Sequence, residues 1–306
     1  MRHLPRLAAT GLVAGLAVSA CGGTADVLQG KSPQQIITLA STSVSSGAYH
    51  MSLDGRMSVD TSGVSGLPSG VMDQLGSMLG NLTMSGSGDV QSSQRMRFSM
   101  TMKPILDKAV EVVFYDGSEF LSQDGGKTFA DAGSFSFNGL PVSPSDQVAL
   151  LKDLATVQDE GSTTRDGQSV EHLHATLGPD YISKVLSKLG GNPQMQQFAT
   201  LFSQVMTLRS GSVDAYVRKA DGKLDSEVTN ASIAFDMKKL FSVLSQAFGG
   251  QVPGGAGGLG NVSGAMVLGE SLTVQLSNYG ENVQITKPTV DPNAPGLPSG
   301  GGLFGV

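Results

Sequence analysis

The chain has 306 residues, 39% of them hydrophobic, and its 26 acidic and 20 basic side chains give a net charge of −6. An acidic chain of this kind argues against nucleic acid as a partner and against adhesion to anionic lipid through a basic patch. The hydrophobic content is enough for one large core or two smaller ones, which argues against disorder throughout.

The N-terminal segment has the pattern of an export signal. Arg2 and Arg6 precede an uncharged run of small and apolar residues, Leu7 to Ala20, which is shorter than the roughly 20 residues of a membrane-spanning helix. The residues Val18 to Cys21 resemble the lipobox of bacterial lipoproteins, in which the cysteine is joined to diacylglycerol and becomes the new N-terminus. Cys21 is the only cysteine, which excludes an intrachain disulfide. The alternative interpretation is an ordinary secreted protein with a stray cysteine.

We therefore expect a lipoprotein signal peptide at 1–20, lipidation of Cys21 and a tether at 21–31. Removal of the signal leaves 18 basic residues against 26 acidic ones, a net charge of about −8. Because this charge does not favour an anionic membrane, the lipid on Cys21 is the expected anchor, with about 0.8 kcal/mol from each buried methylene. No later stretch has the length and apolarity of a membrane span, so the rest of the chain is expected to be extracytoplasmic.

The mature chain begins with a helix and continues with a strand. Ser32 and Pro33 form an N-cap and a first-turn proline, and the apolar spacing that follows predicts a helix over about 33–45. From residue 49 the period changes from 3.6 to 2, which predicts a half-buried strand. The apolar positions of this strand are Tyr49, Met51, Leu53, Met57 and Val59.

Three more alternating strands are expected at 82–90, 96–102 and 110–114, after a segment of helical spacing at 67–79. Gly, Asp and Ser at the turns indicate an antiparallel meander with one wet and one covered face. The apolar positions of these strands are Leu82, Met84, Val90, Met96, Phe98, Met100, Met102, Val110, Val112 and Phe114.

The second half of the chain mixes helices with strands. Helices are expected from about 145 to 154, from 179 to 189, over 195–206 and over 237–248. The expected strands are 156–163, 168–177, 212–218, 224–236, 271–277 and 282–286. A glycine-rich excursion occupies 249–260, and a flexible Pro/Gly-rich tail is expected at 289–306.

About ten strands and four or five amphipathic helices without a strand-helix-strand rhythm predict an α+β fold. The simplest arrangement is one domain, 32–288, in which a strongly curved antiparallel sheet has its apolar face covered by helices.

Three segments, 112–133, 213–237 and 272–290, look like the corresponding parts of the mycobacterial LppX/LprG (LppX_LprAFG) lipoprotein family. The lipobox and the first helix fit the same pattern. The resemblance implies a LolA-like half-barrel, a bent sheet wrapped around helices that encloses an apolar cavity for acyl chains of lipids or lipoglycans. The segments 67–79 and 179–208 depart from the smaller family members and would fill or cover that cavity.

The composition of the expected apolar face agrees with lipid binding. The chain has 13 methionines, 12 phenylalanines and no tryptophan, and methionine is a flexible side chain that adapts to variable alkyl chains. Ordinary core packing is the alternative. We predict that the sheet face and one helical stripe form opposite walls of a cavity. Its lining is expected to be Met51, Leu53, Met57, Met84, Met96, Phe98, Met100, Val112, Phe114, Phe198, Leu201, Phe202 and Val205.

No catalytic constellation is found in the sequence. His172 and His174 form an HxH pair on one strand face, but Glu171 points the other way and no further ligand completes a metal site, so a solvated strand face is expected. The glycine pattern at 255–260 formally matches a dinucleotide-binding motif, yet no strand precedes it and no helix clearly follows. No enzyme activity, metal or cofactor is therefore predicted.

Two functions remain open. The first is a membrane-anchored carrier that binds the acyl chains of a lipid or lipoglycan and carries it across the cell envelope, with an unknown envelope transport protein as a further partner. The second is a non-transporting envelope lipoprotein of the same fold that acts as a sensor or a protein-interaction module.

Overall fold

The computed structural model describes residues 25–66, 70, 80, 82–104, 106–131, 155–188, 203–247, 262–292 and 294. In chain order its elements are α1 (Pro33–Ser46), β1 (Tyr49–Asp60), β2 (Val64–Ser65), β3 (Leu82–Ser92), β4 (Arg95–Lys103), β5 (Leu106–Tyr115), β6 (Ser118–Ser122), β7 (Ala130–Asp131), β8 (Ala155–Arg165), β9 (Gln168–Leu177), α4 (Tyr181–Lys188), β10 (Met206–Arg218), β11 (Leu224–Asp236), α6 (Met237–Ala247) and β12 (Ser263–Ser277).

The strands form one twelve-stranded sheet in the order β7-β6-β5-β4-β3-β1-β12-β11-β10-β9-β8, with β2 paired to β12. All pairings between these strands are antiparallel. The centre of the sheet joins the first strand to the last, β1 to β12. Among the described strands β7 and β8 are edges that do not pair with each other, so the sheet is open. The large antiparallel sheet predicted from the alternation is confirmed.

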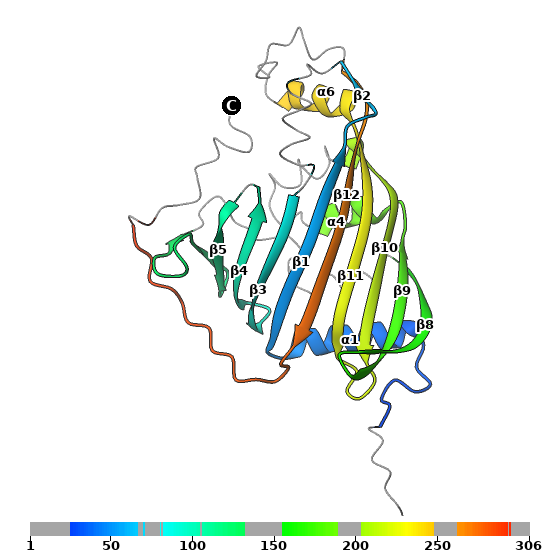
Figure 1. The fold of residues 1–306 in the computed structure, drawn as a ribbon, viewed down its shortest axis with the longest axis vertical. Helices are drawn as coiled ribbons and strands as arrows, with labels where there is room; N and C mark the ends of the chain where they lie inside the picture. Colours follow the sequence, from blue (N-terminus) through cyan, green and yellow to red (C-terminus); the bar gives the residue numbers. More distant parts are fainter. Residues whose placement is uncertain are drawn as a thin grey trace, which may run out of the picture.

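Helix α1 lies across the end of the sheet where β1 begins, and α6 lies with β2 at the opposite end (Figure 1). Ile36 and Ile37 of α1 share one hydrophobic core with Ile182 of α4 and with Leu173 and Leu276 of the sheet. We call the face of the sheet that carries this core the inner face. A sheet wrapped around several helices and an enclosed cavity stay predictions, because the helical segments expected at 67–79, 145–154 and 195–206 lie largely outside the described residues.

The start of α1 follows from its sequence. The Ser32 side chain accepts a hydrogen bond from the Gln35 backbone N–H (3.4 Å), and the Gln35 side chain accepts one from the Ser32 N–H (2.8 Å). This reciprocal capping box satisfies two donors that a helix start leaves free, and Pro33 has no such donor to satisfy. The predicted helix is confirmed, with its last residue at Ser46.

Two hairpins of the sheet have two-residue turns with positive φ at both positions. Asp116 and Gly117 have φ of 49° and 83°, and Asp166 and Gly167 have φ of 46° and 77°. An Asp-Gly pair favours the tight turn whose twist matches the flanking strands. These turns fix the registers of β5 with β6 and of β8 with β9.

Glycines on β3 make room for one aromatic ring of the inner face. A Cβ atom on Gly86 would lie 2.7 Å from Cε1 of Phe98 and 2.7 Å from the Ser99 carbonyl oxygen. One on Gly88 would meet the same ring at 2.8 Å. The Phe98 side chain therefore lies over the backbone of the neighbouring strand, in the space that larger residues would occupy.

The expected strand at 282–286 is wrong. This segment belongs to no strand, and the Ile285 N–H donates to the Gln91 side chain at 3.0 Å. Ile285 instead packs with Val113, Phe120 and Phe129 in a small core separate from the main one. The alternating pattern of this segment reflects packing against a neighbour rather than sheet pairing. The segment continues to a bridge between Phe129 and Val290, at the start of the expected tail.

Two further boundaries differ from expectation. The helix expected over 195–206 does not include Met206, because β10 starts at this residue. Strand β12 starts at Ser263, eight residues before the expected start at Ser271, and glycines at 264 and 269 hide its alternation in the sequence. The longer strands extend the sheet toward α6.

Some expectations lie outside the described residues. These are the signal peptide 1–20, Cys21, the glycine-rich segment 249–260 and the tail beyond Ala294. Within the described part of the chain, no helix has the length and apolarity needed to cross a membrane.

Candidate functional site

The strand registers place the predicted sheet residues on one face. Cross-strand partners share a face, and one row runs from Met51 through Gly88 and Phe98 to Val112. Met96 pairs with Phe114 in the next row. The remaining predicted sheet residues, Leu53, Met57, Met84 and Met100, lie on the same inner face by the same registers.

The helical wall of the predicted cavity is mostly outside the described residues. Phe198, Leu201 and Phe202 are not described, and Val205 is buried in the short helical stretch before β10. The two-walled cavity therefore stays a prediction.

Burial of the inner face decreases from the α1 end of the sheet to the α6 end. On β1, Tyr49 and Met51 are buried, whereas Leu53 and Met57 are partly exposed. The antiparallel strand β12 shows the same trend in space, from buried Leu276 to residues that are partly exposed between 265 and 270. The core is thus closed at the α1 end. Near α6 several inner side chains are only partly covered, although Leu82 and Leu208 are buried there.

Methionines are concentrated where the inner face is only partly covered. Each of these side chains lies on an inner position of its strand and is partly exposed. We call this set the methionine-lined end; it consists of Met57, Met84, Met100, Met102, Met206 and Met266. Flexible, polarizable side chains of this kind suit a surface that must fit variable alkyl chains.

One carboxyl group is buried within the inner face. Glu227 of β11 pairs with Val274 of β12 and with Ala215 of β10, which both belong to the main core. It is 3% exposed, and burial raises its pKa to about 7. Thr229 donates a hydrogen bond to its Oε1 (3.3 Å), while its Oε2 has no hydrogen-bond partner in the described structure.

A second carboxyl group faces the same interior. Glu270 of β12 pairs with Met57 of β1 and with Ala231 of β11, and burial raises its pKa. Burial also raises the pKa of the Tyr181 hydroxyl on α4, and the charges of Glu227 and Glu270 add to this effect. The two carboxyl groups therefore interact electrostatically with the Tyr181 hydroxyl across the inner face.

Neither carboxyl group was among the predicted cavity residues, which were all apolar. The signal was present, since Glu227 and Glu270 occupy positions of apolar parity in alternating strands.

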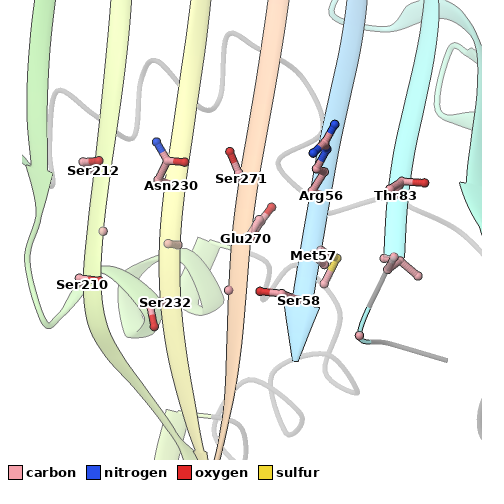
Figure 2. Close-up of a pocket in the computed structure, with 15 residues that line it drawn as sticks. Arg56, Met57, Ser58, Thr83, Ser210, Ser212, Asn230, Ser232, Glu270 and Ser271 are labelled. Carbon is pink, nitrogen blue, oxygen red and sulfur yellow. The ribbon is translucent and has the colours of Figure 1, made fainter. Parts of the chain in front are cut away.

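A pocket of about 620 Å³ spans five neighbouring strands, β3, β1, β12, β11 and β10 (Figure 2). Most of its polar lining comes from two cross-strand rows on the face opposite the inner one. The first row is Thr83, Arg56, Ser271, Asn230 and Ser212, and the second is Ser58, Gly269, Ser232 and Ser210. Between these two rows lies a row of the inner face that also lines the pocket and consists of Leu82, Met57, Glu270, Ala231 and Gly211. The pocket therefore includes part of the methionine-lined end, and an enclosed apolar cavity stays a prediction.

The HxH pair contacts one carboxylate on the neighbouring strand. His172 Nε2 and His174 Nδ1 lie 2.8 Å and 2.9 Å from Oδ1 of Asp214. Burial opposes ionisation of Asp214, but the hydrogen bonds from both histidines outweigh it and lower its pKa. The His172 ring also stacks on Tyr216, with 4.6 Å between the ring centroids. Within the described residues, no group of three or more His, Cys, Asp or Glu side chains is arranged to hold a metal ion.

No protein-family model matches the chain, and no curated protein matches it. The chain is similar in structure to LprF from Mycobacterium bovis, with 11% sequence identity, a TM-score of 0.43 and coverage of 84% of this chain and 96% of that chain. It is also similar to the lipoprotein LppX from Mycobacterium tuberculosis, with 15% identity, a TM-score of 0.35 and coverage of 83% and 97%. A LolA superfamily protein from Nitrosomonas europaea matches with 8% identity, a TM-score of 0.29 and coverage of 83% and 97%. Because these TM-scores lie below 0.5, function has to be inferred from the residues of this chain.

Proposed function

We propose that the chain is a lipoprotein, anchored through Cys21 on the extracytoplasmic side of the cell membrane, which binds the acyl chains of a lipid or lipoglycan against the inner face of its sheet. It then carries this amphiphile across the envelope and acts without enzyme chemistry. The observation that supports the proposal best is the methionine-lined end, where inner apolar side chains of five strands are only partly covered. A contiguous apolar surface that stays accessible is typical of a binding site.

Binding would be driven by the removal of alkyl chains from water. Each methylene that leaves water for the methionine-lined end contributes about 0.8 kcal/mol, so two acyl chains offset a large part of the cost of leaving a bilayer. The filled core beside α1 forms the floor of this site. The chains would therefore enter from the α6 end.

The position of the tether gives the carrier a direction. Asp26 pairs with Lys219 at 2.8 Å and Leu28 is buried, so the chain is held at the α1 end by residue 26. Only residues 22–25 separate Asp26 from Cys21, and each spans at most about 3.5 Å. Strand β1 has 12 residues, a length of about 40 Å. An upright protein would thus present the methionine-lined end away from its own membrane, which favours delivery outward.

A matched pair of variants on β4 tests the proposal. Met100→Lys places a charge on the inner face, whereas Ser99→Lys places one on the exposed outer face of the same strand. The measurement is transfer of a fluorescent phospholipid between vesicles by the mature chain. We expect transfer by the wild type and by Ser99→Lys, and at least a fivefold slower rate for Met100→Lys.

Equal rates for the two variants would contradict binding at the methionine-lined end. A folded wild type that neither binds nor moves lipid would favour the other function, a non-transporting envelope lipoprotein that acts as a sensor or a protein-interaction module.

A further inference from the structure

The inner face contains a polar group that binding of acyl chains does not require. Glu227 is 3% exposed, and its only hydrogen bond in the described structure comes from Thr229 at 3.3 Å. Burial of a carboxyl oxygen without a partner costs about 1–3 kcal/mol, and more if the group is charged. A leucine or methionine at this strand position would avoid that cost. An unpaired acceptor at such a place requires a physical explanation, and a donor group on a bound ligand would supply one.

The position of Glu227 agrees with a role in binding. Its row contains Val274 and Leu53, at the boundary between the filled core and the partly exposed part of the inner face. Glu270 lies four strand positions beyond Val274 toward the methionine-lined end, a distance of about 13 Å along the sheet. A ligand whose alkyl part contacts the methionines would therefore reach Glu227 with its deepest atoms.

No described cation contributes to the pKa of Glu227, Glu270 or Tyr181, and the charges that act on Tyr181 are those of the two carboxyl groups. Burial raises the pKa of Glu227, and the hydrogen bond from Thr229 opposes this effect in part. At the α1 end of the neighbouring strand β10, Lys219 is paired with Asp26 and Glu171, and Arg218 is paired with Asp221. An anionic group placed here would meet two carboxyl groups and no counter-charge.

We propose that Oε2 of Glu227 accepts a hydrogen bond from a hydroxyl or ammonium group at the buried end of the ligand, so that the chain selects neutral or cationic amphiphiles over anionic ones. This selection rests on the proposed function, because the alkyl part of the ligand is held by the methionine-lined end. Glu270 faces the same space and reinforces the preference, since its carboxyl group accepts hydrogen bonds and carries no positive charge. Tyr181 adds no positive charge to this space.

Three probes of equal chain length test the selection: dodecylamine, 1-dodecanol and dodecanoate. Each competes with the neutral dye Nile red for the mature chain at pH 7. We expect the amine and the alcohol to displace the dye, and dodecanoate to need at least a tenfold higher concentration. Comparable displacement by dodecanoate would overturn the proposal.

Two substitutions of Glu227 test whether this residue is responsible for the preference for neutral and cationic amphiphiles. Glu227→Gln keeps an acceptor but removes the negative charge, so affinity for the amine should fall about tenfold while affinity for the alcohol stays within a factor of two. Glu227→Leu should lower affinity for both and bring dodecanoate closer to them. Glu111→Gln is the matched control, because Glu111 is also buried but pairs with Arg97 on the opposite face of the sheet. It should leave all three affinities unchanged.

The outcomes separate this inference from the proposed function. If no probe displaces the dye and Met100→Lys changes nothing, binding of acyl chains itself is wrong. If all probes bind alike and Glu227→Leu matches the wild type, binding stands and the role of Glu227 is refuted. Should Glu227→Leu fail to fold, the comparison of Glu227→Gln with Glu111→Gln still decides the question.

Discussion

Asp26 and Lys219 form an ion pair with 2.8 Å between Oδ2 and Nζ. The Val27 N–H also donates to the Lys219 carbonyl oxygen at 2.9 Å. Lys219 follows the last residue of β10, Arg218, and this strand ends at the α1 end of the sheet (Figure 1). Asp26 and Val27 are thus fixed at the closed end of the inner face.

This contact predicts the orientation of the anchored protein. Ser45→Cys in α1 and Ser62→Cys after β1 place a single dye at opposite ends of the sheet, since both residues are exposed and Cys21 is blocked once lipidated. Energy transfer to an acceptor lipid in the bilayer should be strong from residue 45 and weak from residue 62. Equal transfer from both sites would mean that the protein lies flat, and stronger transfer from residue 62 would reverse the proposed direction.

The buried carboxyl group predicts a pH-dependent stability. The pKa of Glu227 is raised from an ordinary 4.5 to about 7, so the folded state holds a proton that the unfolded state releases. The wild type therefore loses stability as pH rises from about 4.5 through 7. Glu227→Gln, which cannot ionise, should gain up to about 3 kcal/mol over the wild type at pH 8 and little at pH 4.5.

Urea denaturation at the two pH values measures this difference. An equal effect of the substitution at pH 4.5 and pH 8 would show that Glu227 titrates normally and is not buried as described.

The glycines beneath Phe98 predict a local intolerance to side chains. Gly86→Ala would put a methyl group 2.7 Å from the Phe98 ring and from the Ser99 carbonyl oxygen, so we expect a loss of about 1–3 kcal/mol in the free energy of unfolding. Ser87→Ala, on the exposed face one residue away, should cost less than about 0.5 kcal/mol. Similar denaturation midpoints for the two variants would contradict the packing of Phe98 across β3.

The alternation of the sequence was sufficient to predict which side of each central strand belongs to the inner face. In β1 and β4 one face is more buried than the other, so Met51 and Phe98 could be assigned to the inner face from parity alone. The same reasoning failed for 282–286, because Ile285 packs on Phe120 and Val113 without a strand partner. Alternation reports burial on one side and does not distinguish sheet pairing from other packing.

The burial of Glu227 could not be predicted from the sequence of its own strand. Parity puts Glu227 on the inner face, but its isolation depends on Val274 and Ala215 of the neighbouring strands. Strand β12 begins about 40 residues after the start of β11, and β10 precedes β11 in the chain. The pairing of β1 with β12 likewise joins the two halves of the chain. Such long-range neighbours could not be read from local periodicity.

Native mass spectrometry gives the most direct test of acyl-chain binding. The chain is produced in its own host from residue 22 onward behind a cleavable export signal, so that no lipid is attached covalently, and is purified without detergent. The proposal predicts a mass above that of the polypeptide, released as an extractable lipid by organic solvent and diminished in the Met100→Lys variant. A folded chain that has the bare polypeptide mass, and keeps it after incubation with lipid vesicles, would contradict the proposed function.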